Sequence, residues 1–371
     1  MTARKPASGK VRFAVVGAGW VTQAAFLPAI ANAGNAEVVA LVTGDASKGQ
    51  ALATRYGIRH VFGYAEYDRM LTHPDIDAVY LALPNTLHRD YAVPALKAGL
   101  HLLLETPMAT SEQECQEIMA AAERGGGTLM SAYRLHFEPG TLDMLRRVRA
   151  GVIGEPRLFS AVLTRPVDPR NHRMQHGFWS GPVADLGLYP INAARMLFGE
   201  EPLEIVASGG RSGGFDFHDS VSVSLGFDDG RQAQFLVAYS TAPVDQYRLI
   251  GTQGDIEVSP GFDFGPGIAA AYRMQRDGRE IRQEFPEVDQ FGAEIRYFSD
   301  CVLTGREPEP DGEEGYADVR VCAAIEEALR TGQPQSLPVM TRKHRPDPAQ
   351  AMTLPPVKPP GLVNAAPPGE G

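Results

Sequence analysis

Two short stretches near the N-terminus combine residue types that could take part in ligand chemistry, and the first is rich in glycine. Residues 17–22 read Gly-Ala-Gly-Trp-Val-Thr and follow an apolar run, 11–16, that is typical of a β-strand. Between a strand and a helix, the first glycine permits a tight turn and the second lets the backbone approach a pyrophosphate. Thr22 replaces the usual third small residue, and glycines also end strands for structural reasons alone. We interpret the loop as a dinucleotide site whose candidate contacts are Gly17, Gly19, Trp20 and Val21.

The second stretch, residues 43–48, reads Thr-Gly-Asp-Ala-Ser-Lys at the end of the second predicted strand. An acidic side chain at this place accepts the ribose hydroxyls of NAD, whereas cationic and hydroxyl groups hold the 2′-phosphate of NADP. Thr43 and Lys48 fit the phosphate. Alternatively, Asp45 or Ser47 caps the next helix and Lys48 is a surface lysine. We predict NADP(H), with NAD(H) as second choice, and the candidate contacts are Thr43, Gly44 and Lys48.

The elements that position these residues follow from the spacing of apolar side chains. The first 132 residues alternate apolar runs with amphipathic stretches, which indicates βαβ units and a parallel sheet. Later segments such as 220–227 and 232–238 alternate with period two, which is typical of antiparallel strands. We therefore predict an α/β protein with a Rossmann dinucleotide-binding domain and an α+β domain with an open-faced, largely antiparallel sheet. The predicted ranges are 11–132 for the Rossmann domain, 133–335 for the α+β domain, and 336–371 for a Pro-rich tail.

We expect the tail to be disordered or draped over the surface, and the folded core not to need it, because it has little apolar periodicity to bury.

Composition excludes several classes of partner. The net charge of −10 argues against nucleic acid, whose affinity for proteins comes mainly from Lys and Arg. No apolar run approaches the roughly 18–20 residues needed to span a bilayer, and residues 1–10 lack the apolar core of a secretory signal. Three widely spaced cysteines suggest neither a disulfide framework nor a zinc site. We predict a cytoplasmic protein without a membrane partner.

Two histidines, His172 and His176, stand four residues apart, but no third ligand at a suitable spacing accompanies them. We read them as loop residues and predict no metal site.

Several blocks in order along the chain resemble the glucose–fructose oxidoreductase-like (Gfo/Idh/MocA) family. Residues 76–88, IDAVYLALPNTLH, are similar to a block of that family that follows a buried strand. Residues 105–109 read ETPMA where the family normally has EKPMA, and 133–136 read YRLH. Residues 185–189, DLGLY, resemble a block of the family's second domain. The likeness covers about residues 11–335 and implies a Rossmann domain, a nucleotide cofactor, and a sugar or polyol substrate.

The resemblance and the position of residues at the carboxyl edge of the sheet suggest further contacts. Asn85 and His88 follow a buried strand at the edge where doubly wound folds bind ligands, although His88 also fits a plain helix start. Glu105 is implied to contact the nicotinamide side of the cofactor. The full set of further candidate cofactor contacts is Tyr64, Pro84, Asn85, His88, Glu105, Thr106 and Arg134.

The catalytic inference depends on one departure from the family pattern. Hydride transfer at a carbinol carbon also needs a proton transfer at its oxygen. The resemblance assigns that proton to the lysine of EKP, which is Thr106 here, and no lysine lies between residues 98 and 342. Asp185 and Tyr189, four residues apart, share one helix face, and the resemblance turns this face toward the substrate. Asp185, Tyr189 and Thr106 are the candidate catalytic positions, although the first two also fit structural hydrogen bonds.

Three hypotheses remain open from the sequence. The first is an NADP(H)-dependent oxidoreductase that acts on a sugar or related polyol. The second is a nucleotide-binding sensor or scaffold without hydride transfer, and the third is an NAD-dependent glycosidase. An uncovered apolar sheet face also leads us to expect a homo-oligomer.

Overall fold

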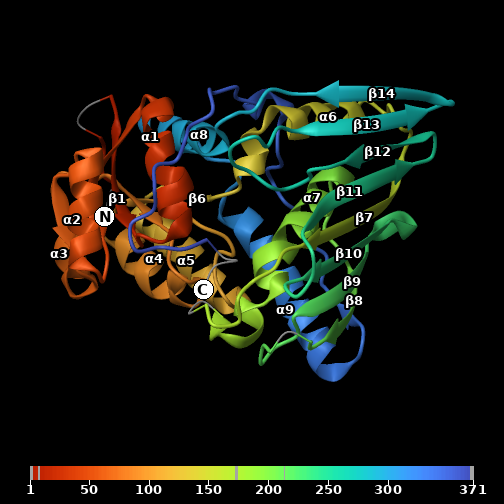
Figure 1. Cartoon of the computed structure of the whole chain (residues 1–371), viewed down its shortest axis with the longest axis horizontal. Helices are drawn as coiled ribbons and strands as arrows, with labels where there is room; N and C mark the ends of the chain where they lie inside the picture. The colour runs from red at the N-terminus through yellow and green to blue at the C-terminus, as the bar shows by residue number, and fades with distance from the viewer. Residues whose placement is uncertain (1–2, 7–8, 172–173, 213, 368–371) are drawn as a thin grey trace. The chain divides into compact units, whose positions relative to one another are not determined.

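The computed structural model describes residues 3–6, 9–171, 174–212 and 214–367. The chain divides into two compact units. The first consists of Met1–Arg134, Asp289–Tyr316 and Thr353–Pro367, and the second contains Leu135–Val288 and Ala317–Met352. Figure 1 shows the elements of both units along the chain.

The first unit is built on a six-stranded parallel sheet with the strand order β3-β2-β1-β4-β5-β6. This is the Rossmann order, and it confirms the predicted fold class. The central strands carry continuous apolar runs because both faces of a parallel sheet are covered. The strands are β1 (Val11–Val16), β2 (Ala36–Val42), β3 (His60–Phe62), β4 (Ala78–Leu81), β5 (His101–Leu104) and β6 (Leu129–Ser131).

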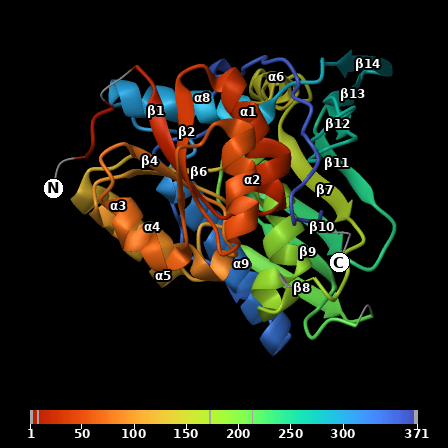
Figure 2. The ribbon, with the colours of Figure 1, turned by 60° about the vertical axis from the view of Figure 1, so that its left-hand side comes forward.

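Helices cover both faces of this sheet. In Figure 2 its strands lie between α3, α4 and α5 on one side and α1 and α8 on the other. The helices are α1 (Leu27–Ala33), α2 (Ala46–Tyr56), α3 (Tyr67–Leu71), α4 (His88–Lys97), α5 (Glu112–Gly125) and α8 (Gln290–Thr304). Helix α9 (Gly312–Thr331) begins in the first unit and continues in the second.

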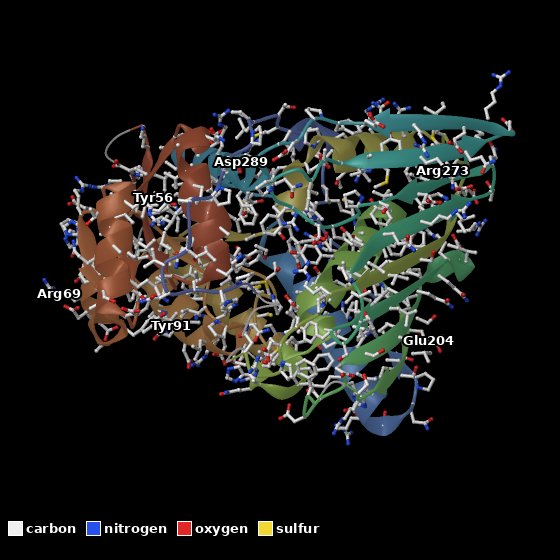
Figure 3. The ribbon with its side chains drawn as sticks, in the orientation of Figure 1. Tyr56, Arg69, Tyr91, Glu204, Arg273 and Asp289 are labelled. Atoms are coloured by element: carbon white, nitrogen blue, oxygen red, sulfur yellow. The ribbon has the colours of Figure 1, made fainter. Side chains whose placement is uncertain are left out.

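The grouping of α8 with the first unit differs from the predicted boundary at residue 132. Asp289, labelled in Figure 3, caps α8, and its carboxylate accepts a hydrogen bond from Asn32 at 2.9 Å. Arg296 donates to the carbonyl oxygens of Ala33 and Asn32 at 2.8 and 2.7 Å. These contacts with α1 join segments more than 250 residues apart, a distance that local periodicity does not reveal.

The second unit is built on a nine-stranded sheet with the order β14-β13-β12-β11-β7-β10-β9-β8-β15. Its pairs are antiparallel except for β7 with β10. Two helices wholly within this unit are α6 (Pro139–Arg149) and α7 (Leu188–Phe198). The strands are β7 (Pro156–Thr164), β8 (Glu204–Gly210), β9 (Ser220–Gly226), β10 (Gln232–Ala238), β11 (Val244–Gly251), β12 (Gly254–Val258), β13 (Ala271–Arg276), β14 (Arg279–Glu284) and β15 (Gln335–Ser336).

One face of the nine-stranded sheet is buried and the other is open. Alternate residues such as Phe159, Phe235 and Leu249 enter the core with α7. The intervening positions include large apolar side chains with at least 36% of their surface exposed, and Leu158 lies directly opposite Ile250 in the register of β7 and β11. The exposed set on this face is Leu158, Val206, Leu236 and Ile250.

The segment predicted as a disordered or surface-draped tail is draped on the protein through specific contacts. Gln335–Ser336 pairs with β8, and the guanidinium of Arg345 lies 3.0 Å from the carboxylate of Glu201. Residues 353–367 group with the first unit. The expectation that the folded core does not need this segment stays a prediction, and ending the chain before the segment would remove these contacts.

None of the helices in the described part of the chain combines the length and the apolar character that crossing a lipid bilayer requires.

Candidate functional site

The glycine loop after β1 has the geometry that the sequence predicted. Gly17 adopts φ +98°, and a Cβ atom there would lie 2.5 Å from the carbonyl oxygen of Ala82, so a larger residue does not fit. A Cβ atom at Gly19 would meet nothing within 4 Å. The backbone at Gly19 is thus open on one side, as close approach of a pyrophosphate requires.

Thr22, which replaces the third small residue of the pattern, has a structural role. Its hydroxyl donates to the carbonyl oxygen of Gly17 at 2.8 Å, and the amide of Gln23 donates to that of Ala18 at 2.9 Å. Both side chains belong to a π-helical turn, Thr22–Phe26, that precedes α1. These hydrogen bonds hold the backbone of the loop in place, so the departure from the GxGxxG pattern leaves the loop intact.

At the end of β2, the alternative that Asp45 caps the helix is confirmed. The Asp45 carboxylate accepts from the backbone N–H of Lys48 at 3.0 Å and from the hydroxyl of Ser47 at 2.7 Å. These bonds, the first above all, hold the pKa of Asp45 well below its usual range. Thr43 is only 6% exposed, and its hydroxyl accepts from the Asp45 N–H at 3.3 Å. Of the two residues predicted to hold a 2′-phosphate, the half-buried Lys48 is therefore the more accessible.

Tyr64 lies beside the same strand end. A Cβ atom at Gly44 would lie 3.3 Å from Cε2 of Tyr64, so the ring packs directly on this glycine. The ring is 37% exposed and meets Tyr91 edge to face, with 6.0 Å between the centroids. Tyr64 thus offers a partly exposed aromatic surface at the end of β2, where the sequence predicted a cofactor contact.

His88 is a structural residue in this fold. It is 1% exposed, and its ring nitrogens lie 2.9 Å from the carbonyl oxygens of Pro107 and Leu83. Burial lowers the pKa of the imidazole, so the neutral ring donates to one carbonyl at a time. The ring ties the loop after β4 to the loop after β5, which holds Pro84 and Asn85 in place. These bonds give His88 a supporting role, and its contact with the cofactor stays a prediction.

Glu105 follows β5 and belongs to a group of buried polar side chains. The hydroxyl of Tyr80 donates to its carboxylate at 2.5 Å, and the Tyr80 ring stacks on Phe26 of the π-helical turn at 3.7 Å. Burial raises the pKa of Glu105 despite this bond and one from the Thr106 N–H. Glu294 of α8 is fully buried, and neither of its carboxylate oxygens has a hydrogen-bond partner among the described residues.

Burial, and next the charge of Glu105, raise the pKa of Glu294 well above its usual range. This pair of carboxyl groups therefore keeps a shared proton to a higher pH than exposed glutamates would. Arg134, predicted as a cofactor contact, is 5% exposed and donates to the side chain of Gln290. Its positive charge acts on Glu105 and Glu294, so the structure places Arg134 in the interior of the first unit.

The predicted catalytic pair lies in the second unit. Asp185 is exposed in a π-helical turn, Val183–Gly187, and Tyr189 is half-buried in α7. The hydroxyl of Tyr239 lies 3.0 Å from the Asp185 carboxylate, which it can reach as a hydrogen-bond donor. Asp185 thus has a hydrogen-bond partner in Tyr239, and the π-helical turn that carries Asp185 runs directly into α7, which carries Tyr189.

Arg165 is a nearby residue that sequence reasoning missed. It directly follows β7 and donates to Asp263 at 2.7 Å. Burial would lower the pKa of Arg165, but the charges of Asp185 and Asp263 and the phenol of Tyr189 outweigh it, so the pKa is raised. No strand was predicted before Arg165, so nothing in the sequence marked this arginine as part of a site.

His136, by contrast, is a buried structural residue. Its ring lies 2.8 Å from the side-chain oxygen of Asn192, whose amide donates to Asp318 at 3.1 Å. His172 lies outside the described residues, and the backbone of His176 donates to the Ser180 hydroxyl at 3.0 Å.

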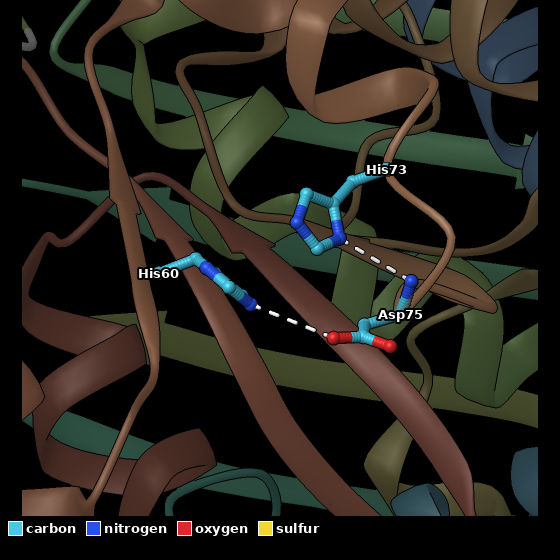
Figure 4. Close-up of side chains that lie close together, drawn as sticks. All are labelled: His60, His73 and Asp75. Atoms are coloured by element: carbon cyan, nitrogen blue, oxygen red, sulfur yellow. Dashed lines mark hydrogen bonds and ion pairs between the residues drawn. The ribbon is translucent and has the colours of Figure 1, made fainter.

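Within the described residues, one group of side chains is compact enough to hold a metal ion, and the sequence did not reveal it. Potential ligand atoms of His60, His73 and Asp75 lie within 4.8 Å of one another (Figure 4). The group lies at the amino edge of the sheet, because His60 begins β3 and Asp75 precedes β4. Some of these potential ligand atoms already have other partners. Arg12 lies 3.3 Å from the Asp75 carboxylate, and the Asp75 N–H donates to Nδ1 of His73 at 3.2 Å. The absence of a metal stays a prediction.

Comparison with known proteins gives the family. Residues 11–133 match the model of an oxidoreductase family with an NAD-binding Rossmann fold, and 141–257 match the GFO/IDH/MocA C-terminal domain. The chain is 30% identical over 332 residues to a D-xylose 1-dehydrogenase [NADP(+)] of Haloarcula marismortui, covering 86% of this chain and 91% of that one.

Two solved structures are similar over most of their length. The first is an aldose–aldose oxidoreductase from Caulobacter crescentus, with a TM-score of 0.83, 32% identity, and coverage of 88% of this chain and 100% of that one. The second is a 3-ketoreductase from Actinomadura kijaniata in complex with NADP and TDP-benzene, with a TM-score of 0.79, 27% identity, and coverage of 87% and 98%. The resemblance seen in the sequence is confirmed, and the chain belongs to the GFO/IDH/MocA family of oxidoreductases.

Proposed function

We propose that the protein is an NADP(H)-dependent oxidoreductase that transfers a hydride to or from a sugar or a related polyol. The observation that carries this proposal is the glycine loop, in which Gly17 is sterically required and the backbone at Gly19 is open. The similar D-xylose dehydrogenase is named for NADP(+), and the similar ketoreductase was solved with NADP. The D-xylose dehydrogenase and the similar aldose–aldose oxidoreductase are both named for sugars, which supports the substrate class.

The first unit supplies groups that fit a dinucleotide. The loop at Gly17 and Gly19 would hold the pyrophosphate, Tyr64 would offer its ring beside the adenosine, and Lys48 would neutralise a 2′-phosphate. Glu105 would meet the nicotinamide end, as the resemblance implies. The bound cofactor supplies or accepts the hydride.

The proton that accompanies the hydride needs a separate group. In the direction of carbonyl reduction, the hydroxyl of Tyr189 would donate its proton to the substrate oxygen and become a phenolate, and the bound cofactor would supply the hydride to the carbonyl carbon. The charge of Arg165 would stabilise that phenolate, and Asp185 would accept a hydrogen bond from a substrate hydroxyl. Thr106 would not exchange the proton, because its hydroxyl stays protonated in the working pH range.

The test is a reduced-nicotinamide absorbance assay with a panel of sugars, with p-nitrophenyl glycosides run in parallel. We expect turnover that is slow with ordinary sugars, rises in Thr106→Lys, and is lost in Tyr189→Phe. Brisk native turnover that Tyr189→Phe leaves unchanged would mean that another group exchanges the proton. Nucleotide binding without turnover, and no gain from Thr106→Lys, would favour the sensor or scaffold. Glycoside cleavage would favour the glycosidase.

Two further properties complete the proposal. The apolar open face of the nine-stranded sheet supports a homo-oligomer, because large exposed apolar faces are rarely left in water. Cys115, Cys301 and Cys322 are all buried thiols outside any disulfide, which supports the reducing, cytoplasmic location predicted from the sequence.

A further inference from the structure

The C-terminal segment runs along the helices that follow β1 and β2. Residues 353–367, dark blue at the end of the colour bar in Figure 1, belong to the first unit. The side chain of Asn32, near the end of α1, donates to the carbonyl oxygen of Pro355 at 2.7 Å. Arg55, in the last turn of α2, donates to that of Gly361 at 2.7 Å. The segment then continues toward the starts of these helices, at the carboxyl edge of the sheet.

The next attachment reaches the glycine loop itself. The amide of Gln23 donates to the carbonyl oxygen of Val363 at 3.0 Å and accepts from the Val363 N–H at 2.8 Å. The same amide nitrogen donates to Ala18, inside the loop, at 2.9 Å. Gln23 is 2% exposed, so both N–H groups and the oxygen of its amide are used in a buried position. One side chain thus fixes the loop and the C-terminal segment together.

The following residue reaches the end of β2. The amide of Asn364 donates to the second carboxylate oxygen of Asp45 at 3.1 Å. Asn364 adopts φ +43°, a left-handed conformation that asparagine tolerates better than most residues with a side chain. This turn lets residue 364 contact α2 immediately after residue 363 contacts the helix after β1.

Two adjacent residues therefore bridge the two parts of a Rossmann unit that hold a dinucleotide. The loop that Gln23 supports is the pyrophosphate site, and the end of β2 is the site of the adenosine ribose. Because one residue spans at most about 3.6 Å of chain, the attachments of Val363 to Gln23 and of Asn364 to Asp45 lie close together. The space beside Gly19 stays open, so the segment is attached at Gln23 and Asp45 and does not cover the glycine loop.

We propose that residues 361–367 are part of the dinucleotide site, where they act as a strap that closes its adenosine side and slows release of the cofactor. This inference rests on the proposed function, since it concerns how the NADP(H) of that site is retained. Without the Gln23 and Asp45 attachments, the loop and the end of β2 separate more readily, and the bound nucleotide leaves.

The test uses the full-length protein and a double variant, Val363→Pro with Asn364→Ala. Proline removes the N–H that Gln23 accepts, and alanine removes the amide that binds Asp45. Lys358→Ala, an exposed position in the same segment, is the matched control. NADPH is bound to each protein and displaced with excess NADP⁺ in a stopped-flow experiment that follows nicotinamide fluorescence. We expect NADPH to dissociate about tenfold faster from the double variant and at the wild-type rate from the control, because the double variant loses two of the hydrogen bonds that fasten the strap, together about 1.4 kcal/mol.

A second measurement follows hydrogen exchange in residues 361–367 of the wild-type protein, where bound NADPH should slow exchange. Equal dissociation rates in the wild-type protein and the double variant would overturn the strap while leaving the proposed function intact. Faster association and tighter binding in the double variant would also overturn it, because the segment would then block the site. Failure of the wild-type protein to bind NADPH or NADP⁺ would overturn the strap and the proposed function together.

Discussion

The buried pair of carboxyl groups in the first unit predicts how stability depends on pH. We consider Glu294→Gln, which keeps the size and shape of the side chain and removes its ability to ionise. Glu294 is fully buried without a hydrogen-bond partner among the described residues, and burial and the nearby Glu105 raise its pKa above the usual 4.5. In the unfolded chain the same carboxyl group ionises near its usual pKa.

The sign and size of the effect follow from proton binding. Above about pH 4.5 the folded protein holds a proton that the unfolded chain has released, so the free energy of unfolding falls as the pH rises. The slope for one proton is about 1.4 kcal/mol per pH unit until the pH reaches the pKa in the folded protein. Each pH unit inside this window therefore costs the wild-type protein stability that Glu294→Gln does not lose. The pKa of Glu105, which burial raises, acts in the same direction in both proteins.

The assay is denaturant unfolding without nucleotide, followed by circular dichroism between about pH 5 and about pH 8. The quantity compared is the difference in unfolding free energy between Glu294→Gln and the wild-type protein at each pH. Other titrating groups cancel in this difference, and Glu123→Gln, at an exposed position of α5, is the control with no expected pH dependence. We expect the difference to shift in favour of the variant as the pH rises. A difference that stays constant over this range would refute the assignment of a shared proton to the pair.

Three other predictions concern the cofactor, the core and the open sheet. Lys48→Ala should weaken NADP(H) binding by roughly tenfold or more in a calorimetric titration while leaving NAD(H) binding unchanged, and an equal loss for both nucleotides would contradict the 2′-phosphate contact. Asp318→Asn should lower the unfolding free energy by about 3–5 kcal/mol, because it removes a carboxylate from the fully buried guanidinium of Arg195; a loss no larger than that of Glu123→Gln would count against it. Leu236→Glu, which places a charge on the open face, should shift the protein to a smaller species in sedimentation, whereas Val339→Glu, at a position 80% exposed outside the sheet, should not; identical sedimentation of both variants would argue against this interface.

The parallel sheet and its nucleotide loop could be predicted because their signals are local. A glycine at position 17 follows an apolar strand, and its positive φ and its contact with Ala82 supply the physical need for that residue. Asp45 as a helix cap was also foreseen as an alternative, because a cap depends only on the three residues that follow it.

What could not be predicted depends on contacts between distant segments. Glu294 gives no sign in the sequence of being fully buried near Glu105, since a glutamate in a helix usually faces water. His88 was predicted as a ligand contact because it follows a buried strand at the carboxyl edge of the sheet, and Arg134 because of the family resemblance. The structure uses His88 to join two loops and places Arg134 among buried carboxyl groups.

The return of residues 289–316 and 353–367 to the first unit has a consequence for how the protein is made. Residues 1–134 leave the ribosome long before α8, which packs on α1, has been made. The segment that binds Gln23 is made later still. Because domains generally form in the order of synthesis, the nascent Rossmann sheet must wait with part of its apolar surface uncovered. Its nucleotide loop gains its last supports only after residue 363 has emerged. Maturation of the first-made unit thus depends on residues made more than 150 positions later, and a chain that stalls before α8 would expose the apolar surface of the Rossmann sheet to chaperones.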